Sequence, residues 1–127
     1  MYISSSDSSN FHPSNEPHNF VIELPRTYFG VKRIALLEFS CQSFTEPLYV
    51  FCDLVDRSLV HDQALAVLRY INEPGEIQNP LFVNTTQVSF NRIAFQVVSS
   101  RDMNDAINIG EVHLILALED SNENEGE

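Results

Sequence analysis

The chain of 127 residues has no tryptophan, only two cysteines and four glycines, and no long uninterrupted apolar run. The glycines stand far apart, at positions 30, 75, 110 and 126, which excludes the glycine-rich loops that hold phosphate groups in P-loop and dinucleotide-binding proteins. Two cysteines are too few for a disulfide framework. No apolar run approaches the roughly 20 residues that a membrane-spanning helix requires.

Basic residues are also scarce. Seven Lys and Arg stand against eighteen Asp and Glu, which gives a formal net charge of -11, and the basic residues are scattered apart from the pair Lys32 and Arg33. Nucleic-acid binding relies on basic groups that neutralise phosphates, and an anionic membrane surface repels an acidic protein. We therefore expect neither a nucleic acid nor a membrane as a partner.

The two ends of the chain are polar. Residues 1–10 are rich in serine and lack the basic and apolar regions of a secretory signal, so we expect no export by that route. Residues 4–19 show no periodicity, and residues 1–18 are predicted to form an extended N-terminal arm. Residues 119–127 contain five carboxylates and no apolar side chain, which predicts a solvated acidic tail.

Between these ends, apolar and polar residues alternate with the period of two that is typical of β-strands. The clearest run covers residues 111–119, and residues 20–24, 48–55 and 87–98 show related patterns. Several short strands joined by turns, with no helical period longer than about 8 residues, are typical of a sandwich. The sequence predicts one all-β domain over residues 19–118, an antiparallel β-sandwich of the jelly-roll kind.

Residues 31–40 are apolar on both faces at their centre, which predicts a central strand covered on both sides. We expect this strand to form a hairpin with residues 48–55. In such a hairpin Cys41 and Cys52 would lie about four positions apart, roughly 13 Å. That separation exceeds the ~7 Å between Cα atoms that a disulfide can bridge, so free thiols are predicted.

Residues 56–62 read as a polar connection, and residues 64–71 fit either a short helix or a strand. A strand is favoured for residues 64–71 because the run is short and the turn sequence Glu73-Pro74-Gly75 ends it sharply.

The richest window for chemistry holds Cys52, Asp53, Asp56, His61 and Asp62. Cys52 falls on an apolar strand face, so a buried cysteine near an exposed loop histidine is a better interpretation than a Cys–His pair. The carboxylates and His61 lack a recognised metal-ligand spacing. We therefore expect no enzyme activity, no metal and no cofactor.

Two stretches of the sequence resemble the sequences of a known protein family. The first is Leu48-Tyr49-Val50-Phe51-Cys52-Asp53-Leu54-Val55, with Val60-His61-Asp62 and Leu68-Arg69-Tyr70-Ile71 after it; the second is Phe90-Asn91-Arg92-Ile93-Ala94-Phe95, leading to Gly110-Glu111-Val112-His113-Leu114-Ile115-Leu116. Together they resemble the jelly-roll virion proteins of Polinton-like elements, adintoviruses and related double-stranded DNA viruses. Residues 11–15 and 19–24 are similar in style to the N-terminal segment of that family. Its members are longer, usually carry Gly where His61 stands, and have a Gly-rich final hairpin where this chain has residues 104–108.

The resemblance implies a non-enzymatic structural protein of the virus particle, in a minor capsid, penton-type, cement or spike role. Such a protein is located in the virion and packs as a homo-oligomer against copies of itself and other virion proteins. The interface candidates are Phe11, His12, Pro13, Phe20, Tyr28, Phe29 and His113. The alternative is a monomeric binding module that recognises a peptide or a carbohydrate through the loops at residues 56–63 and 99–110.

Overall fold

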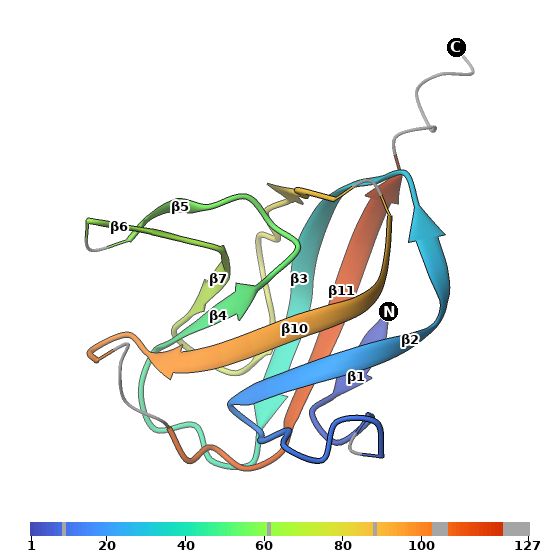
Figure 1. Ribbon diagram of the computed structural model, residues 1–127. Helices are drawn as coiled ribbons and strands as arrows, with labels where there is room; N and C mark the ends of the chain where they lie inside the picture. The colour runs from blue at the N-terminus through green and yellow to red at the C-terminus, as the bar shows by residue number, and fades with distance from the viewer. Residues whose placement is uncertain (9, 61, 88, 103–106, 121–127) are drawn as a thin grey trace.

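A computed structural model describes residues 1–8, 10–60, 62–87, 89–102 and 107–120 (Figure 1). These residues form β-strands and connecting loops and contain no helix, and every strand pairing among them is antiparallel. The prediction of an all-β protein is therefore confirmed.

The strands form two principal sheets and one small hairpin. Sheet A has the order β1-β11-β3-β8, with β9 also paired to β3; these strands are β1 (Tyr2–Ser4), β11 (Val112–Asp120), β3 (Val31–Cys41), β8 (Gly75–Glu76) and β9 (Val83–Asn84). Sheet B has the order β2-β10-β4-β7, made of β2 (Asn19–Phe29), β10 (Ser89–Ser99), β4 (Leu48–Cys52) and β7 (Val67–Ile71). The hairpin joins β5 (Ser58–Val60) and β6 (Gln63–Leu65).

The core lies between the two sheets, which form the layers of a β-sandwich in Figure 1, with β2 and β10 crossing β3 and β11. Alternation along each strand sends every second side chain inward. Sheet A contributes Ile34, Leu36, Phe39, Leu114 and Leu116, and sheet B contributes Phe20, Val50, Ile93, Phe95 and Val97. Each fully buried side chain of this size contributes about 1.5–3 kcal/mol to folding.

The order of pairing along the chain is nested. β1 pairs with β11, β2 with β10, β3 with both β8 and β9, and β4 with β7. Successive pairs of this series lie alternately in sheet A and sheet B. Strands early in the chain therefore pair with strands late in the chain, and the innermost pair is the β5–β6 hairpin.

The predicted hairpin between residues 31–40 and 48–55 is wrong. β3 lies in sheet A and β4 lies in sheet B, so residues 42–47 cross from one layer to the other. Alternation identifies the inward face of a strand but not the strand beside it, and a short loop suits a hairpin or a crossing equally well. The central position of β3 is confirmed, because β11 lies on one side and β8 and β9 on the other.

Both cysteines are free, as predicted, although the predicted hairpin geometry is not the reason. Cys41 ends β3 in sheet A, and Cys52 ends β4 in sheet B. The two thiols therefore belong to different layers of the sandwich.

Residues 64–71 form strand and no helix, but not one strand. The run breaks at Ala66, where β6 ends and β7 begins, and only β7 joins sheet B. β6 pairs instead with β5, which lies inside the stretch predicted as a polar connection. Three-residue strands are too short for a period of two to be visible in the sequence.

The start of the chain differs from the predicted extended arm. β1 is an edge strand of sheet A, Met1 and Leu116 exchange two hydrogen bonds of 2.8 Å, and Ile3 is only 1% exposed. The apolar run Met1-Tyr2-Ile3 is too short to carry a periodic signal, yet Ile3 fills a place in the core. The sandwich accordingly begins at Tyr2.

The end of the sandwich also lies beyond the predicted boundary at residue 118. β11 continues to Asp120, and Glu119 accepts a hydrogen bond of 2.5 Å from Nε of Arg33 on β3. These two carboxylates, predicted as part of the acidic tail, belong to sheet A. The rest of that prediction, residues 121–127, lies outside the described residues.

Candidate functional site

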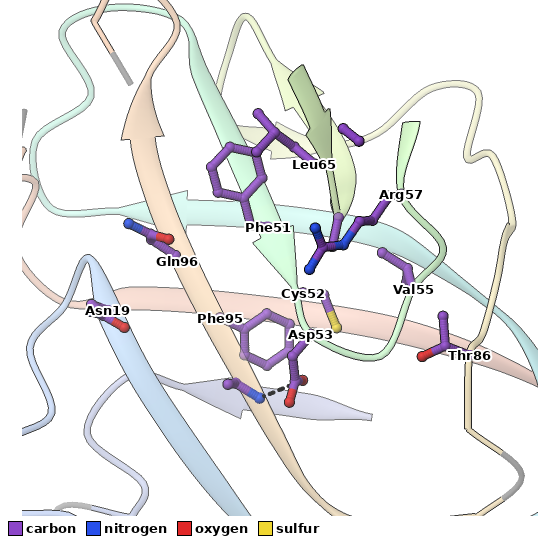
Figure 2. A pocket seen from close by; sticks show the side chains of 13 residues that line it. Asn19, Phe51, Cys52, Asp53, Val55, Arg57, Leu65, Thr86, Phe95 and Gln96 are labelled. Carbon is purple, nitrogen blue, oxygen red and sulfur yellow. Dashed lines mark hydrogen bonds between the residues drawn. The ribbon is translucent and has the colours of Figure 1, made fainter. Parts of the chain in front are cut away.

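The outer face of sheet B carries a cleft of about 520 Å³ between β4, β10 and the β5–β6 hairpin (Figure 2). Its volume lies in the range of about 300–1,000 Å³ that is common for ligand sites. Apolar side chains line much of it: Phe51, Ala64, Leu65, Ala66 and Ala94. Polar side chains come from five further positions: Asn19, Asp53, Arg57, Thr86 and Gln96.

Strand register sets the floor of this cleft. Gln96 on β10 lies opposite Phe51 on β4 in one direction and opposite Asn19 on β2 in the other. Within β4, Leu48, Val50 and Cys52 are buried, so Tyr49 and Phe51 point outward. One row across three strands therefore presents a carboxamide, a second carboxamide and an aromatic ring to the same side.

Asp53 is held in a fixed position beside this row. Its Oδ1 accepts a hydrogen bond of 2.9 Å from the backbone N–H of Ala94, and its own N–H donates to the carbonyl of Ala94 over 3.1 Å (Figure 2). The side chain thus extends the contact between β4 and β10 by one residue. Its second oxygen, Oδ2, has no protein partner in the described part of the chain.

Arg57 brings a positive charge to the cleft. Figure 2 shows its guanidinium reaching over the space between Phe51 and Cys52. Among the described residues, the side chains of Arg57, Asn19 and Gln96 have no hydrogen-bond or ion-pair partner. Three polar groups that face one cleft are therefore available to a ligand.

An aromatic group continues the apolar surface from the cleft towards β7. The rings of Tyr49 and Phe51 are nearly parallel, with centroids 6.3 Å apart, and Tyr70 on β7 lies 5.3 Å from Tyr49. Tyr70 lies opposite Tyr49 in the strand register and is exposed. The outer face of sheet B is thus aromatic over β4 and β7 and concave beside them.

A second polar cluster joins the segment between β1 and β2 to the edge of sheet B. Glu23 Oε2 lies 2.6 Å from His12 Nε2 and accepts a hydrogen bond of 2.6 Å from Nε of Arg92. The hydrogen bonds from His12 and Arg92 lower the pKa of the Glu23 carboxyl. Ser8 Oγ accepts a bond of 2.9 Å from the N–H of Glu23.

A third cluster lies on the outside of sheet A, where Tyr2 bonds through its hydroxyl to Nδ1 of His113. Nε2 of His113 lies 3.2 Å from Oε1 of Glu111, and Oε2 of Glu111 accepts hydrogen bonds from Ser4 and Ser6. A phenol, a histidine and a carboxylate in this order form the chain that activates a nucleophile in some enzymes. Tyr2 is 61% exposed to water, and the network joins β1 to the start of β11.

The predicted interface residues lie in several different places. Phe11 and Phe29 are each 73% exposed and Pro13 is exposed. Tyr28 is half-buried and stacks on Phe90 at 5.7 Å, with Arg26 over its ring at 4.2 Å. His12 and His113 are half-buried in the two clusters above.

Phe20 is the exception among these candidates. Its ring is 1% exposed and packs against Phe95 in the core, with centroids 5.4 Å apart. A surface role for Phe20 in this fold is therefore wrong. The alternation of Phe20, Ile22 and Leu24 in the sequence places these residues on one face of a strand. The burial of Ile22 shows that this face points into the core.

Sequence reasoning missed five large apolar side chains that are exposed in the described residues: Tyr2, Leu59, Tyr70, Leu81 and Phe82. Four of these lie on short strands or loops, where local alternation does not separate a buried face from an exposed one. The meeting of the polar cleft residues was also missed, because it depends on strand register; Asp53 was singled out only within another cluster, and Arg57 lies in the loop at residues 56–63 that the alternative hypothesis names.

In the window of Cys52, Asp53, Asp56 and Asp62, the Cys52 thiol is buried at the end of β4. Burial raises the pKa of the Cys52 thiol to about 12, so the thiol stays protonated at neutral pH. The three carboxylates are exposed, and His61 lies outside the described residues. Within the described ranges, no group of three or more His, Cys, Asp or Glu is placed to hold a metal ion, and no helix is suited to cross a membrane.

Comparisons with known proteins identify no relative. The chain has no significant match among protein-family models, curated proteins or solved structures.

Proposed function

We propose that this protein is a non-enzymatic structural component of a virus particle, built on a jelly roll. Its role is that of a minor capsid, penton-type, cement or spike protein, and it acts by packing against copies of itself and other virion proteins. The observation that carries the proposal is the nested pairing of the strands.

A jelly roll is a double sheet of eight strands built from two Greek keys. If β8 and β9, which both pair with β3, count as one interrupted strand, sheets A and B each have four strands. The pairs β1–β11, β2–β10, β3–β8/β9 and β4–β7 then alternate between the sheets. An antiparallel ribbon rolled around a core produces this arrangement, which supports the jelly-roll part of the proposal.

Three of the stretches that carry the family resemblance lie on neighbouring strands. Residues 48–55 contain β4, residues 68–71 belong to β7, and residues 90–95 belong to β10. These three strands are neighbours in sheet B. The remaining long stretch, residues 110–116, belongs mostly to β11 of sheet A, so the resemblance covers strands of both layers.

Exposed apolar side chains support a role in packing. Phe29 ends β2 beside the Gly30 turn, and Leu81 and Phe82 precede β9, which pairs with the first half of β3. Large exposed apolar groups mark interaction surfaces when they gather into a patch. A specific interface buries roughly 1,000 Å² or more in total, and its apolar part contributes about 25 cal/mol per Å².

The direct test is the mass of the purified full chain in solution. Sedimentation and native mass spectrometry at micromolar concentration are expected to give a discrete multiple of the 14.4 kDa chain. Electron microscopy of the same sample should then show closed, symmetric particles, because most homo-oligomers have closed symmetry. A stable monomer across this range overturns the packing role.

The virion role has its own test. Mass spectrometry of purified particles from cells that carry the gene should find the chain in amounts comparable with other particle proteins. Particles that lack the chain would contradict the proposal even if the purified protein assembles.

A further inference from the structure

We propose that the cleft on the outer face of sheet B binds a neutral carbohydrate of one or two sugar units. This site goes beyond the packing role and does not depend on it. The inference follows from the kinds of polar group that face the cleft, from its aromatic wall and from the strands that hold both.

The polar groups of the cleft are a balanced set of donors and acceptors. Arg57 only donates hydrogen bonds, the free Oδ2 of Asp53 only accepts them, and the carboxamides of Asn19 and Gln96 do both. A sugar hydroxyl donates one hydrogen bond and accepts others, so it can pair with any member of this set. A ring with several hydroxyls matches several of these groups at once.

Other ligand classes fit the same groups less well. An organic anion would be attracted by Arg57 but repelled by Asp53, in a chain whose formal net charge is -11. A purely apolar ligand would cover the free polar groups and leave them without water or a partner, which costs about 1–3 kcal/mol for each group. A neutral polyol avoids both penalties.

The ring of Phe51, which forms the aromatic wall of the cleft, can pack against the apolar face of a sugar ring. A pyranose ring carries hydroxyls around its rim and C–H groups on its faces. The face of an aromatic ring is negative and attracts the slightly positive hydrogens of C–H groups. Phe51 lines the cleft, and Tyr49 stacks parallel to it, which limits the movement of the Phe51 ring.

The site is organised before a ligand arrives. Asn19, Gln96 and Phe51 stand in one register row on three paired strands, and Asp53 is tied to Ala94. Side chains on rigid strands lose less freedom on binding than side chains on loops. The alternating strands of sheet B thus present donors, acceptors and a ring at fixed spacings.

The test uses ¹⁵N-labelled full chain and a panel of neutral disaccharides: maltose, cellobiose, lactose and N,N′-diacetylchitobiose. At least one sugar is expected to shift the side-chain amide signals of Asn19 and Gln96 in a saturable way. The side-chain amide of Gln78, which is exposed and outside the cleft, should not shift. This comparison separates binding in the cleft from a general effect of dissolved sugar.

Variants test the assignment of residues. Arg57→Ala and Gln96→Ala should each weaken binding about tenfold or more, as expected for the loss of one hydrogen bond to a ligand. Ala64→Phe, which adds a ring to the exposed hairpin wall of the cleft, should abolish binding. The matched controls Arg101→Ala and Gln78→Ala should bind as the parent protein does.

All five positions are exposed, so circular dichroism and the melting temperature should show an unchanged fold. The proposal is overturned if no sugar of the panel gives a saturable shift, or if the cleft variants bind as well as the controls. It is also overturned if benzoate or octanoate binds in the cleft while the sugars do not.

Discussion

The carboxamide of Asn15 binds both the N–H and the carbonyl of Val21, each over 2.9 Å. Val21 lies on β2, the edge strand of sheet B, so one side chain supplies the bonds that a neighbouring strand would make. Asn19 also exchanges two backbone bonds of 3.0 Å with Glu16. The segment between β1 and β2 therefore covers the first half of an edge that could otherwise pair with another chain.

Replacement of Asn15 should uncover that edge. In Asn15→Ala both bonds to Val21 are lost, and each is worth about 0.5–1.5 kcal/mol. We expect the free energy of unfolding to fall by about 1–3 kcal/mol and aggregation on heating to increase. Urea unfolding and light scattering measure the two effects. Asn10→Ala, at an exposed position in the same segment, is the control and should change neither.

Truncation of Ile3 distinguishes a strand from a free arm. Ile3→Ala removes a side chain that is 1% exposed, and such a change in a core costs about 2–5 kcal/mol. Phe11→Ala, at a position that is 73% exposed, should cost well under 1 kcal/mol. Equal stability of the two variants in urea unfolding would mean that β1 is not part of the sandwich in solution.

Low pH should reduce the free energy of unfolding, because Glu23 and Glu111 become protonated. Hydrogen bonds from His12 and Arg92 lower the pKa of Glu23, and those from Ser6 and Ser4 lower the pKa of Glu111. A carboxyl whose pKa is lower in the folded state than in the unfolded state stabilises the fold at pH values above its unfolded-state pKa. This stabilisation is lost as the pH falls through the folded-state pKa. Unfolding midpoints should therefore drop as the pH falls below about 4.5.

Glu23→Gln and Glu111→Gln should flatten this acid dependence, because a carboxamide does not titrate. Glu73→Gln, at an exposed turn outside both clusters, is the charge-matched control and should keep the slope of the parent. Midpoints measured by urea unfolding at several pH values between 7 and 3 provide the comparison. An identical slope in all three variants would show that the two clusters do not form in solution.

The two thiols should react at different rates. Burial raises the pKa of Cys52 to about 12 and also raises the pKa of the half-buried Cys41. Because the thiolate is the reactive form, the folded Cys41→Ser variant should be almost inert to iodoacetamide at pH 8. The same variant should react fully in denaturant. Rapid labelling of the folded variant would contradict the burial of Cys52.

Self-association should depend on the exposed phenylalanine at the end of β2. Phe29→Ser removes a large apolar group and should weaken the association. We expect the variant oligomer to dissociate at a protein concentration about tenfold higher than the concentration at which the parent oligomer dissociates. Asn91→Ser, an exposed polar position on β10, is the control. Sedimentation at a series of concentrations measures both. If Phe29→Ser associates like the parent, the interface lies elsewhere on the sandwich.

Several elements could be predicted from local pattern because their side chains alternate over many residues. β11, β10 and the first half of β2 are long enough for the period of two to show which face is buried, and β3 is apolar on both faces at its centre. β1 was not predicted, because the apolar run Met1-Tyr2-Ile3 is too short to show a period and a serine-rich stretch follows it. The division of residues 63–71 between β6 and β7 also leaves no periodic trace.

The sequence by itself determined that this is an all-β chain, which residues of its long strands face the core, and that Cys52 is buried. Only the tertiary structure decided that β3 and β4 lie in different layers, that β1 pairs with β11, and that Asn19, Gln96, Phe51 and Arg57 surround one cleft. Burial of side chains is a local property of alternating residues, so it can be read along the chain. Strand partners and the meeting of distant side chains depend on which pairing fills the whole core, so they emerge only when the chain is folded.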